Sequence, residues 1–294
     1  MTRKAAMTRA RFEERLFGVL RRLVIAFLVV ITLLPFFYLV LLSLKPIDAL
    51  LLDPGSLWVS AEDFTLTTYR DVLRSPDAGG QGFWRFLLNS ALVSLGTVAL
   101  TLVAAVPGAY AVSRLKFFGH RQVSALFLAV YLFPSTLLAV PLFVIFARIG
   151  LSSSLVGLAV VYVAQTVPVS IYMLRNYLMT IPHSIEEAAA LDGCSRLRTV
   201  REVILPLALP SLMATGLYVF MIAWNEFLFA LLFLAADPDK WTVSLGLAQL
   251  SNGIEVPKTV LMAGSVVLTV PVVILFFAAE RLLTEGLTSG ADKS

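Results

Sequence analysis

Residues 183–210 read HSIEEAAALDGCSRLRTVREVILPLALP, a polar and charged stretch that runs directly into an apolar one. The chain around it is 59% hydrophobic and only 14% charged, with a mean hydropathy of +0.87. Soluble domains carry about 25% charged residues. The composition therefore excludes an ordinary soluble domain, and it makes this stretch a polar loop within a membrane protein.

Six segments are long and apolar enough to cross about 30 Å of hydrocarbon, which takes roughly 20 helical residues. Between them they contain one acid, Glu226. We therefore expect an all-α polytopic membrane protein with six transmembrane helices and both termini on the same side. The six segments are residues 23–44, 86–113, 122–147, 149–174, 203–236 and 259–279.

The distribution of basic residues predicts the orientation. With the termini inside, the inner segments hold 16 of the 23 Lys and Arg residues, whereas the acids divide evenly between the two sides. Cytoplasmic loops carry such an excess, so both termini are expected in the cytoplasm. The predicted organisation is a basic arm (1–22), a membrane domain (23–279) with an outer loop (45–85) and an inner loop (175–206), and a cytoplasmic tail (280–294).

The inner loop predicts a short, well-delimited helix. Pro182 ends the preceding element, and Ser184 with Glu187 three residues later fits a capping box. Gly193 suits a left-handed cap, so the helix is expected over residues 185–192, with a second helical run from about Arg196. Eight residues are too few for a stable isolated helix. The pattern leaves two alternatives open: the helix inserts into a cleft on another protein, or it lies flat against its own bundle.

Catalytic and cofactor motifs are missing from the sequence. It has no G-x-x-x-x-G-K-[ST] phosphate loop, no H-E-x-x-H and no G-x-S-x-G. The separated His120 and His183 and the single Cys194 make no metal site. The net charge of +4 reflects the inner basic residues, not a nucleic-acid partner. We expect a non-enzymatic chain that binds no cofactor.

The inner loop resembles the hallmark of permease subunits of binding-protein-dependent ABC importers, which is EAA, three residues, G, nine residues, I, one residue, LP. Val203 replaces the Ile, which is the only departure and a mild one. The other matching positions are Glu187, Ala188, Ala189, Gly193, Leu205 and Pro206.

The resemblance covers nearly the whole chain and is closest to the maltose-transporter, MalG-like type of carbohydrate-uptake permeases. It implies the type I ABC importer permease fold. The matching pieces are SLKP (43–46), FTLTTYRDVL (64–73), NSALVSLGTVAL (89–100), AYAVSRLKFFG (109–119), FPSTLLAVPLF (133–143), WNEF (224–227) and GLTSGA (286–291).

The resemblance also implies partners. These are a second, MalF-like permease, two copies of an ATP-binding subunit that carry ATP and Mg²⁺, an extracytoplasmic sugar-binding protein and membrane lipid, in a bacterial or archaeal cytoplasmic membrane. The loop helix would be a coupling helix seated in a groove of the ATPase. The residues expected in this contact are Ser184, Glu186, Glu187, Ala188, Ala189, Leu191, Asp192, Gly193, Leu205 and Pro206.

Three further regions are candidates for contact with solute or partners. A charge at mid-bilayer costs on the order of 2.5–3.5 kcal/mol, so Glu226 with Trp224 and Asn225 is a candidate sugar path. The alternatives are an interhelical hydrogen bond or a wet site near the outer interface. The resemblance implies that the outer loop, with Trp58, Tyr69 and Trp84, is a landing surface for the binding protein, and the alternative is a solvated loop that only covers the bundle. The tail residues expected to touch the ATPase are Gly286, Leu287, Thr288 and Gly290.

Two questions of function stay open at this stage. A di- or oligosaccharide such as maltose or trehalose is the first expectation for the solute, on resemblance alone, and a phosphorylated polyol or another non-sugar solute is the second. A proton-coupled secondary transporter that uses Glu226 is an alternative of a different class. It would have no use for the EAA loop.

Overall fold

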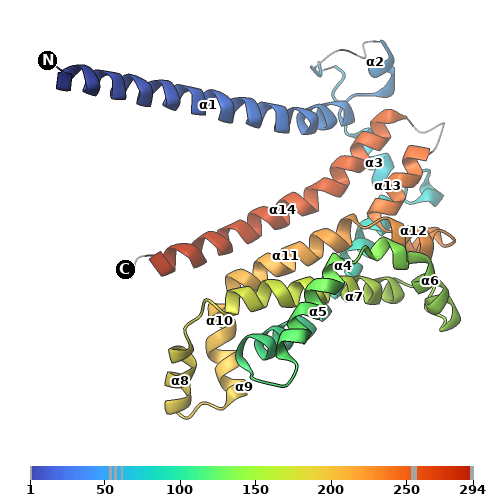
Figure 1. The fold of residues 1–294 in the computed structure, drawn as a ribbon. Helices are drawn as coiled ribbons and strands as arrows, with labels where there is room; N and C mark the ends of the chain where they lie inside the picture. The colour runs from blue at the N-terminus through green and yellow to red at the C-terminus, as the bar shows by residue number, and fades with distance from the viewer. Residues whose placement is uncertain (1, 53–54, 56–57, 61, 253–256, 292–294) are drawn as a thin grey trace. The chain divides into compact units, whose positions relative to one another are not determined.

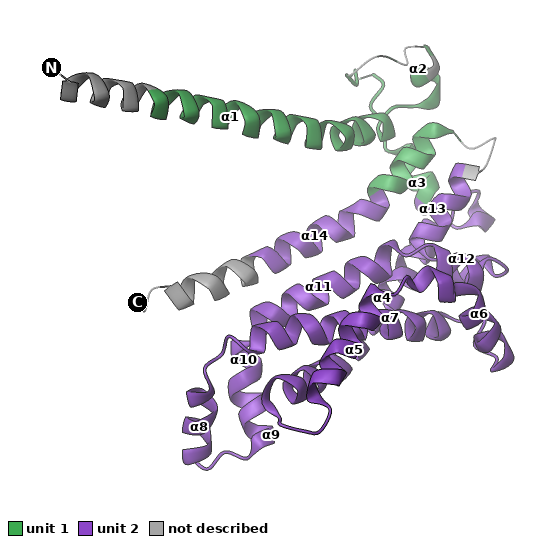
Figure 2. Ribbon diagram, in the orientation of Figure 1, with its two compact units in different colours: residues 1–72, 255–266 green, residues 73–254, 267–294 purple. Residues whose placement is uncertain are grey.

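The computed structural model describes the chain except residues 1, 53–54, 56–57, 61, 253–256 and 292–294, with the backbone alone at 2–12, 51, 252 and 281–291. The described residues form helices and contain no strand. They divide into two compact units, residues 1–72 with 255–266 and residues 73–254 with 267–294 (Figure 2). Each unit is described by itself.

Four helices are long and apolar enough to cross a membrane: α1 (Thr2–Ser43), α4 (Phe83–Arg114), α7 (Leu155–Leu178) and α14 (Lys258–Ala291). Two more candidates are bent pairs (Figure 1). The described residues therefore contain four spans, or up to six if each bent pair is one span. The all-α membrane fold is confirmed, and six crossings stay a prediction.

Prolines bend the predicted third and fifth spans. The third consists of α5 (His120–Leu132), the turn η2 (Ser135–Leu138) and α6 (Ala139–Arg148), with an 82° bend. Phe133 takes an extended conformation before Pro134, because proline disfavours helical geometry in the residue before it. The fifth has a 76° bend before α11 (Leu209–Asn225), whose first turn contains Pro210.

The remaining elements are short and connect these spans. They are α2 (Ile47–Leu52), α3 (Thr67–Leu73), η1 (Pro76–Ala78), α8 (His183–Leu191), α9 (Arg196–Thr199), η3 (Val200–Ile204), α10 (Leu205–Leu207), α12 (Leu228–Leu234), η4 (Pro238–Lys240) and α13 (Val243–Asn252).

The second unit is built around α4, which packs against α7 and α11. Ala105 and Ala109 of α4 are fully buried, and small residues let helix backbones approach closely in a membrane. The Thr101 and Thr166 hydroxyls are 2.8 Å apart and hydrogen-bond across the α4–α7 interface. Both polar groups are buried, so this bond satisfies them away from lipid.

The first unit contains α1, whose most apolar 18-residue window has no buried residue. Large side chains such as Phe27, Leu33 and Phe36 are exposed along it. An apolar surface of this length is suited to lipid or to another chain, not to water. The end of α1 is fixed locally, since the Ser43 and Tyr69 hydroxyls are 2.5 Å apart and Thr65 N–H donates to Leu44 O over 2.9 Å.

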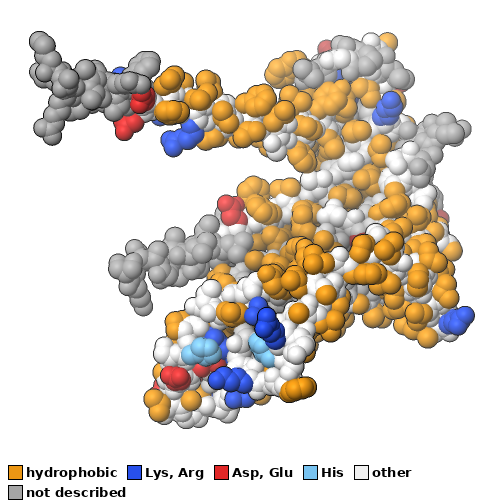
Figure 3. Space-filling model, viewed as in Figure 1, with side chains coloured by type: hydrophobic (Ala, Val, Ile, Leu, Met, Phe, Trp, Pro, Cys, Tyr) orange, Lys and Arg blue, Asp and Glu red, His pale blue; other side chains and the backbone are white. Residues whose placement is uncertain are grey.

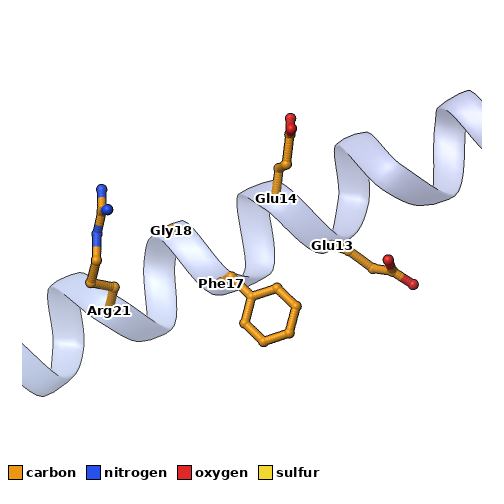
Figure 4. Close-up of a pocket in the computed structure, with 5 residues that line it drawn as sticks. All are labelled: Glu13, Glu14, Phe17, Gly18 and Arg21. Carbon is orange, nitrogen blue, oxygen red and sulfur yellow. The ribbon is translucent and has the colours of Figure 1, made fainter.

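A shallow hollow lies on α1 (Figure 4), lined by Glu13, Glu14, Phe17, Gly18 and Arg21. All five residues come from a single helix, spaced along its surface. A single helix encloses no volume, so we do not treat this hollow as a candidate site.

Candidate functional site

The polar loop contains α8, which begins at His183, two residues earlier than expected. Its N-cap is Pro182, which makes no side-chain cap hydrogen bond, and Ser184 lies inside the first turn. The capping box predicted for Ser184 and Glu187 is therefore wrong. The physical reason is that Pro182 has its φ fixed at −59° and an extended ψ, so the helix begins immediately after it at His183.

The left-handed C-terminal cap is confirmed. Gly193 has φ +79°, Cys194 N–H donates to Ala189 O over 3.0 Å, and Gly193 N–H donates to Ala190 O over 3.1 Å. This pair of bonds is the Schellman motif, which satisfies carbonyls that the helix end leaves free. A Cβ at Gly193 would meet no atom within 4 Å, so backbone conformation alone calls for glycine here.

The two faces of α8 differ sharply. Ile185 packs against a buried cluster that includes Ala109 and Leu178, and Ala189 is buried. On the other side Glu187, Ala188 and Asp192 are exposed, and Leu191 is 90% exposed. One face of α8 therefore lies on the chain's own bundle, as the second alternative predicts, while insertion of the exposed face into another protein stays a prediction.

Glu186 fixes α8 to the end of α4. Its Oε1 lies 2.6 Å from Arg114 Nε in an ion pair, with the two side chains only 17% and 4% exposed. Tyr110, one turn earlier in α4, donates its hydroxyl to Glu186 Oε2 over 2.9 Å. Arg114 also donates to Ile181 O over 2.8 Å. The sequence analysis includes Glu186 among the residues expected to contact the ATPase, but it does not identify Arg114 as its partner. No motif links residues so far apart in the chain.

The return into the membrane passes through a widened turn. The Ser195 hydroxyl accepts from Arg198 N–H and caps α9, as the predicted second helical run requires. The following η3 is a π-helical turn in which Leu205 N–H donates to Val200 O. Pro206 has no N–H to offer, so an α-helical bond cannot form at that position. The chain then turns at Ala208, between α10 and α11, where the 76° bend lies.

Polar side chains gather where α8 and α9 lie, at one end of the second unit (Figure 3). A cavity of about 280 Å³ opens there. It is lined by residues of α4, α8, α9 and the segments that follow α4 and α8, among them Tyr110, Arg114, His183, Glu186, Cys194 and Arg196.

The second candidate site is the break between α11 and α12, which forms around Glu226. Glu226 has extended backbone geometry (φ −67°, ψ 132°) and ends α11. Its carboxylate accepts from Phe229 N–H (2.9 Å to Oε1), Ala230 N–H (3.1 Å to Oε2) and Tyr162 O–H (2.6 Å to Oε2). The carboxylate therefore caps α12 and connects it to α7, which is the interhelical hydrogen bond left open by the sequence.

Trp224 and Asn225 have different surroundings. Trp224 is 2% exposed, stacks on Phe220 and donates its indole N–H to Leu268 O over 3.1 Å. Asn225 is exposed and donates to Met221 O of its own helix. Only Asn225 of this pair offers an accessible side chain, on the face of α11 that also carries exposed Met221 and Ile222.

The remaining candidates lie at the outer loop and the tail. In the outer loop Trp58 and Trp84 are exposed, while Tyr69 is partly buried. The tail candidates Gly286, Leu287, Thr288 and Gly290 belong to α14, which continues as a helix to Ala291, but their side chains lie outside the described residues. Within the described part of the chain, no group of three or more His, Cys, Asp or Glu residues could hold a metal ion.

Comparisons with known proteins agree on one family. Residues 98–288 match the family described as "Binding-protein-dependent transport system inner membrane component". The chain is 36% identical to the inner membrane ABC transporter permease protein YcjP of Escherichia coli, over 92% of this chain and 94% of that protein. It is 37% identical to the trehalose/maltose transport system permease protein MalG of Thermococcus litoralis, over 90% and 92%.

A solved structure supports the fold. The chain matches a chain of a bacterial ABC transporter involved in the import of the acidic polysaccharide alginate with a TM-score of 0.76 and 23% identity, over 92% of this chain and 97% of that one.

Proposed function

The chain belongs to the family of binding-protein-dependent transport system inner membrane components, and we propose that it is the permease subunit of an ATP-driven sugar importer. It forms half of the translocation pathway and carries out no catalysis itself. The solute is a di- or oligosaccharide of the maltose or trehalose kind, which a relative's name supports. The order of its polar and apolar segments supports a multi-pass protein with both termini in the cytoplasm.

The observation that carries the proposal is the two-faced α8. A helix of nine residues is held on the bundle by Ile185 and Glu186, while Leu191 and Glu187 stay exposed. An exposed leucine on a short, rigidly attached helix is suited to contact with another protein. The partner for this face is the ATP-binding subunit, in two copies per transporter, which carries the ATP and Mg²⁺ that this chain does not bind.

The other partners are a second, MalF-like permease and an extracytoplasmic sugar-binding protein. The long exposed apolar surfaces of α1 and α14 support contact with lipid and with the second permease. Exposed Trp58 and Trp84 support contact with the binding protein, because aromatic side chains are enriched at the centres of protein interfaces. Asn225 is the candidate for direct contact with the sugar, since its amide is accessible.

The test is purification of the tagged chain from membranes, followed by reconstitution of the complex. Co-purification of a P-loop ATPase and a second permease, with sugar uptake that stops when ATP is withheld, is the expected result. Uptake that ignores ATP and collapses with a proton uncoupler would establish the secondary transporter instead. Uptake of a phosphorylated polyol in preference to disaccharides would retain the ATP-driven permease and replace its solute.

A further inference from the structure

The junction of α4 and α8 contains a buried polar network with no counterpart in the EAA pattern. Arg114 is the last residue of α4 and 4% exposed, and its guanidinium contacts three groups of the loop. These are the Glu186 carboxylate (Nε to Oε1, 2.6 Å), the Ile181 carbonyl (2.8 Å) and the His183 ring (Nη1 to Nε2, 3.2 Å). Tyr110 completes the network on Glu186 Oε2.

We propose that this network, which we name the Arg114–Glu186 clamp, transmits the movement of α8 to α4. The inference rests on the proposed function, because it requires a partner that displaces α8. Arg114, Tyr110 and Glu186 then act as positioning residues, since none of them reaches the exposed face of α8 where the ATPase would bind.

The location of the clamp favours transmission over simple anchoring. Apolar contacts, such as that of Ile185 with its cluster, have no directional preference and permit sliding. The Arg114 guanidinium is held from two sides, because it donates to the Ile181 carbonyl and its Nε is ion-paired with the Glu186 carboxylate, a contact that is not aligned as a hydrogen bond. The clamp therefore sets the register of α8 on α4, so that a push on Leu191 or Glu187 is carried into the bundle.

The receiving helix is the one that can use this movement. α4 is 32 residues long, or about 48 Å, and it packs against both α7 and α11. Toward the other end of α4, Asn89 connects it to η4 and the residue that follows η4. Its side chain donates to Asp239 O (2.9 Å) and Trp241 O (3.0 Å). A displacement of α4 at Arg114 is thus carried to α7 and α11, and past Pro107 toward the other end of α4.

Breaking the clamp should separate ATP hydrolysis from transport. In the full reconstituted complex, we expect Glu186→Gln and Arg114→Gln to retain ATP hydrolysis while sugar uptake per ATP falls at least about fivefold, the lower range of site-to-site coupling. The charge swap of Arg114→Glu with Glu186→Arg restores the ion pair but not the bonds to Ile181 O and from Tyr110 O–H, so it should recover only part of the loss. A role in stability alone would lower assembly and both activities together, with no change in their ratio.

Two comparisons keep the test decisive. Glu202→Gln breaks the nearby ion pair with Arg198, whose side chains are more than half exposed, and should leave uptake per ATP unchanged. Tyr110→Phe removes only one hydroxyl and leaves the ion pair in place, so it should lower the ratio by less than Glu186→Gln does. Unchanged uptake per ATP in Glu186→Gln, or in Tyr110→Phe if the charge variants do not assemble, would overturn the clamp. A wild-type complex without ATP-dependent uptake would refute the proposed function instead.

Discussion

Glu226 offers the sharpest test of what an acid does inside this bundle. Its carboxylate accepts three hydrogen bonds, from Tyr162 O–H and from the Phe229 and Ala230 N–H groups. Hydrogen bonds to charged groups contribute about 1.5–3 kcal/mol each. If Glu226 holds the α11–α12 break together, its removal should destabilise the fold before it changes recognition of the solute.

The change to make is Glu226→Gln, because it keeps the size and one acceptor oxygen. The glutamine NH₂ group would then face at least one of the backbone N–H donors, and the charge would be lost from the remaining bonds. We expect the loss of about one charge-assisted bond and weakening of the others, or about 2–4 kcal/mol. At about 2–4 °C per kcal/mol, the melting temperature should fall by about 4–16 °C.

The assay is thermal melting of the purified complex in lipid nanodiscs, with the Tyr162→Phe variant and the double variant measured alongside. Tyr162 is fully buried and its hydroxyl bonds to Glu226, so the two changes should couple by about 1–2 kcal/mol in a double-mutant cycle. Asn225→Ala is the matched control, because this exposed neighbour donates to Met221 O within its own helix and should shift the melting temperature by less than about 2 °C.

One outcome would refute the reasoning. If Glu226→Gln leaves the melting temperature unchanged but weakens the apparent affinity for sugar, Glu226 belongs to the solute path and its bonds in this structure are incidental. If the melting temperature falls while the apparent affinity of the surviving complex is unchanged, the carboxylate is a structural tie.

Four further predictions concern other elements. Gly193→Val should destabilise the α8 cap by about 1–2 kcal/mol and lower uptake per ATP, because a β-branched residue resists φ +79°. Gly193→Asn should have a milder effect, and equal activity of the two variants would contradict this. Gly246→Ala should lower the stability of the fold by about 1–3 kcal/mol, because its Cβ would lie 2.4 Å from Phe86 Cδ2. Gly96→Ala is the control: a Cβ there meets open space, so the variant should be neutral or stabilising in the same melting assay. The Asp237 carboxyl should titrate in NMR with a pKa below its usual range because Lys240 hydrogen-bonds to it, and Lys240→Gln should raise that pKa. Truncation before Gly286 should reduce stimulation of the ATPase if the tail touches it, and full stimulation would rule that contact out.

The membrane class, the helical architecture and the short loop helix with its glycine cap could all be predicted from the sequence. Each depends on local information: hydrophobic run length against bilayer thickness, and the conformational freedom that only Gly193 has at a helix end. The spacing from Glu187 to Pro206 likewise indicated the family, because all of its positions lie within one loop.

The capping box predicted at Ser184 is wrong because α8 begins one residue before Ser184. Pro182 ends the preceding element, and it is also the N-cap of α8, which begins at His183. A sequence pattern cannot distinguish two starting points one or two residues apart, whereas the fixed φ of proline and its packing can.

Tertiary structure alone decided which acids are paired and with what. Glu186 and Glu187 are neighbours of the same chemistry, but the turn of α8 aims one at Arg114, in another helix, and leaves the other exposed. Glu226 is joined to Tyr162 of α7, and Trp224 donates to Leu268 O of α14, for the same reason. Burial and ion pairing depend on which helix faces are brought together, and no local signal in the sequence encodes those long-range contacts.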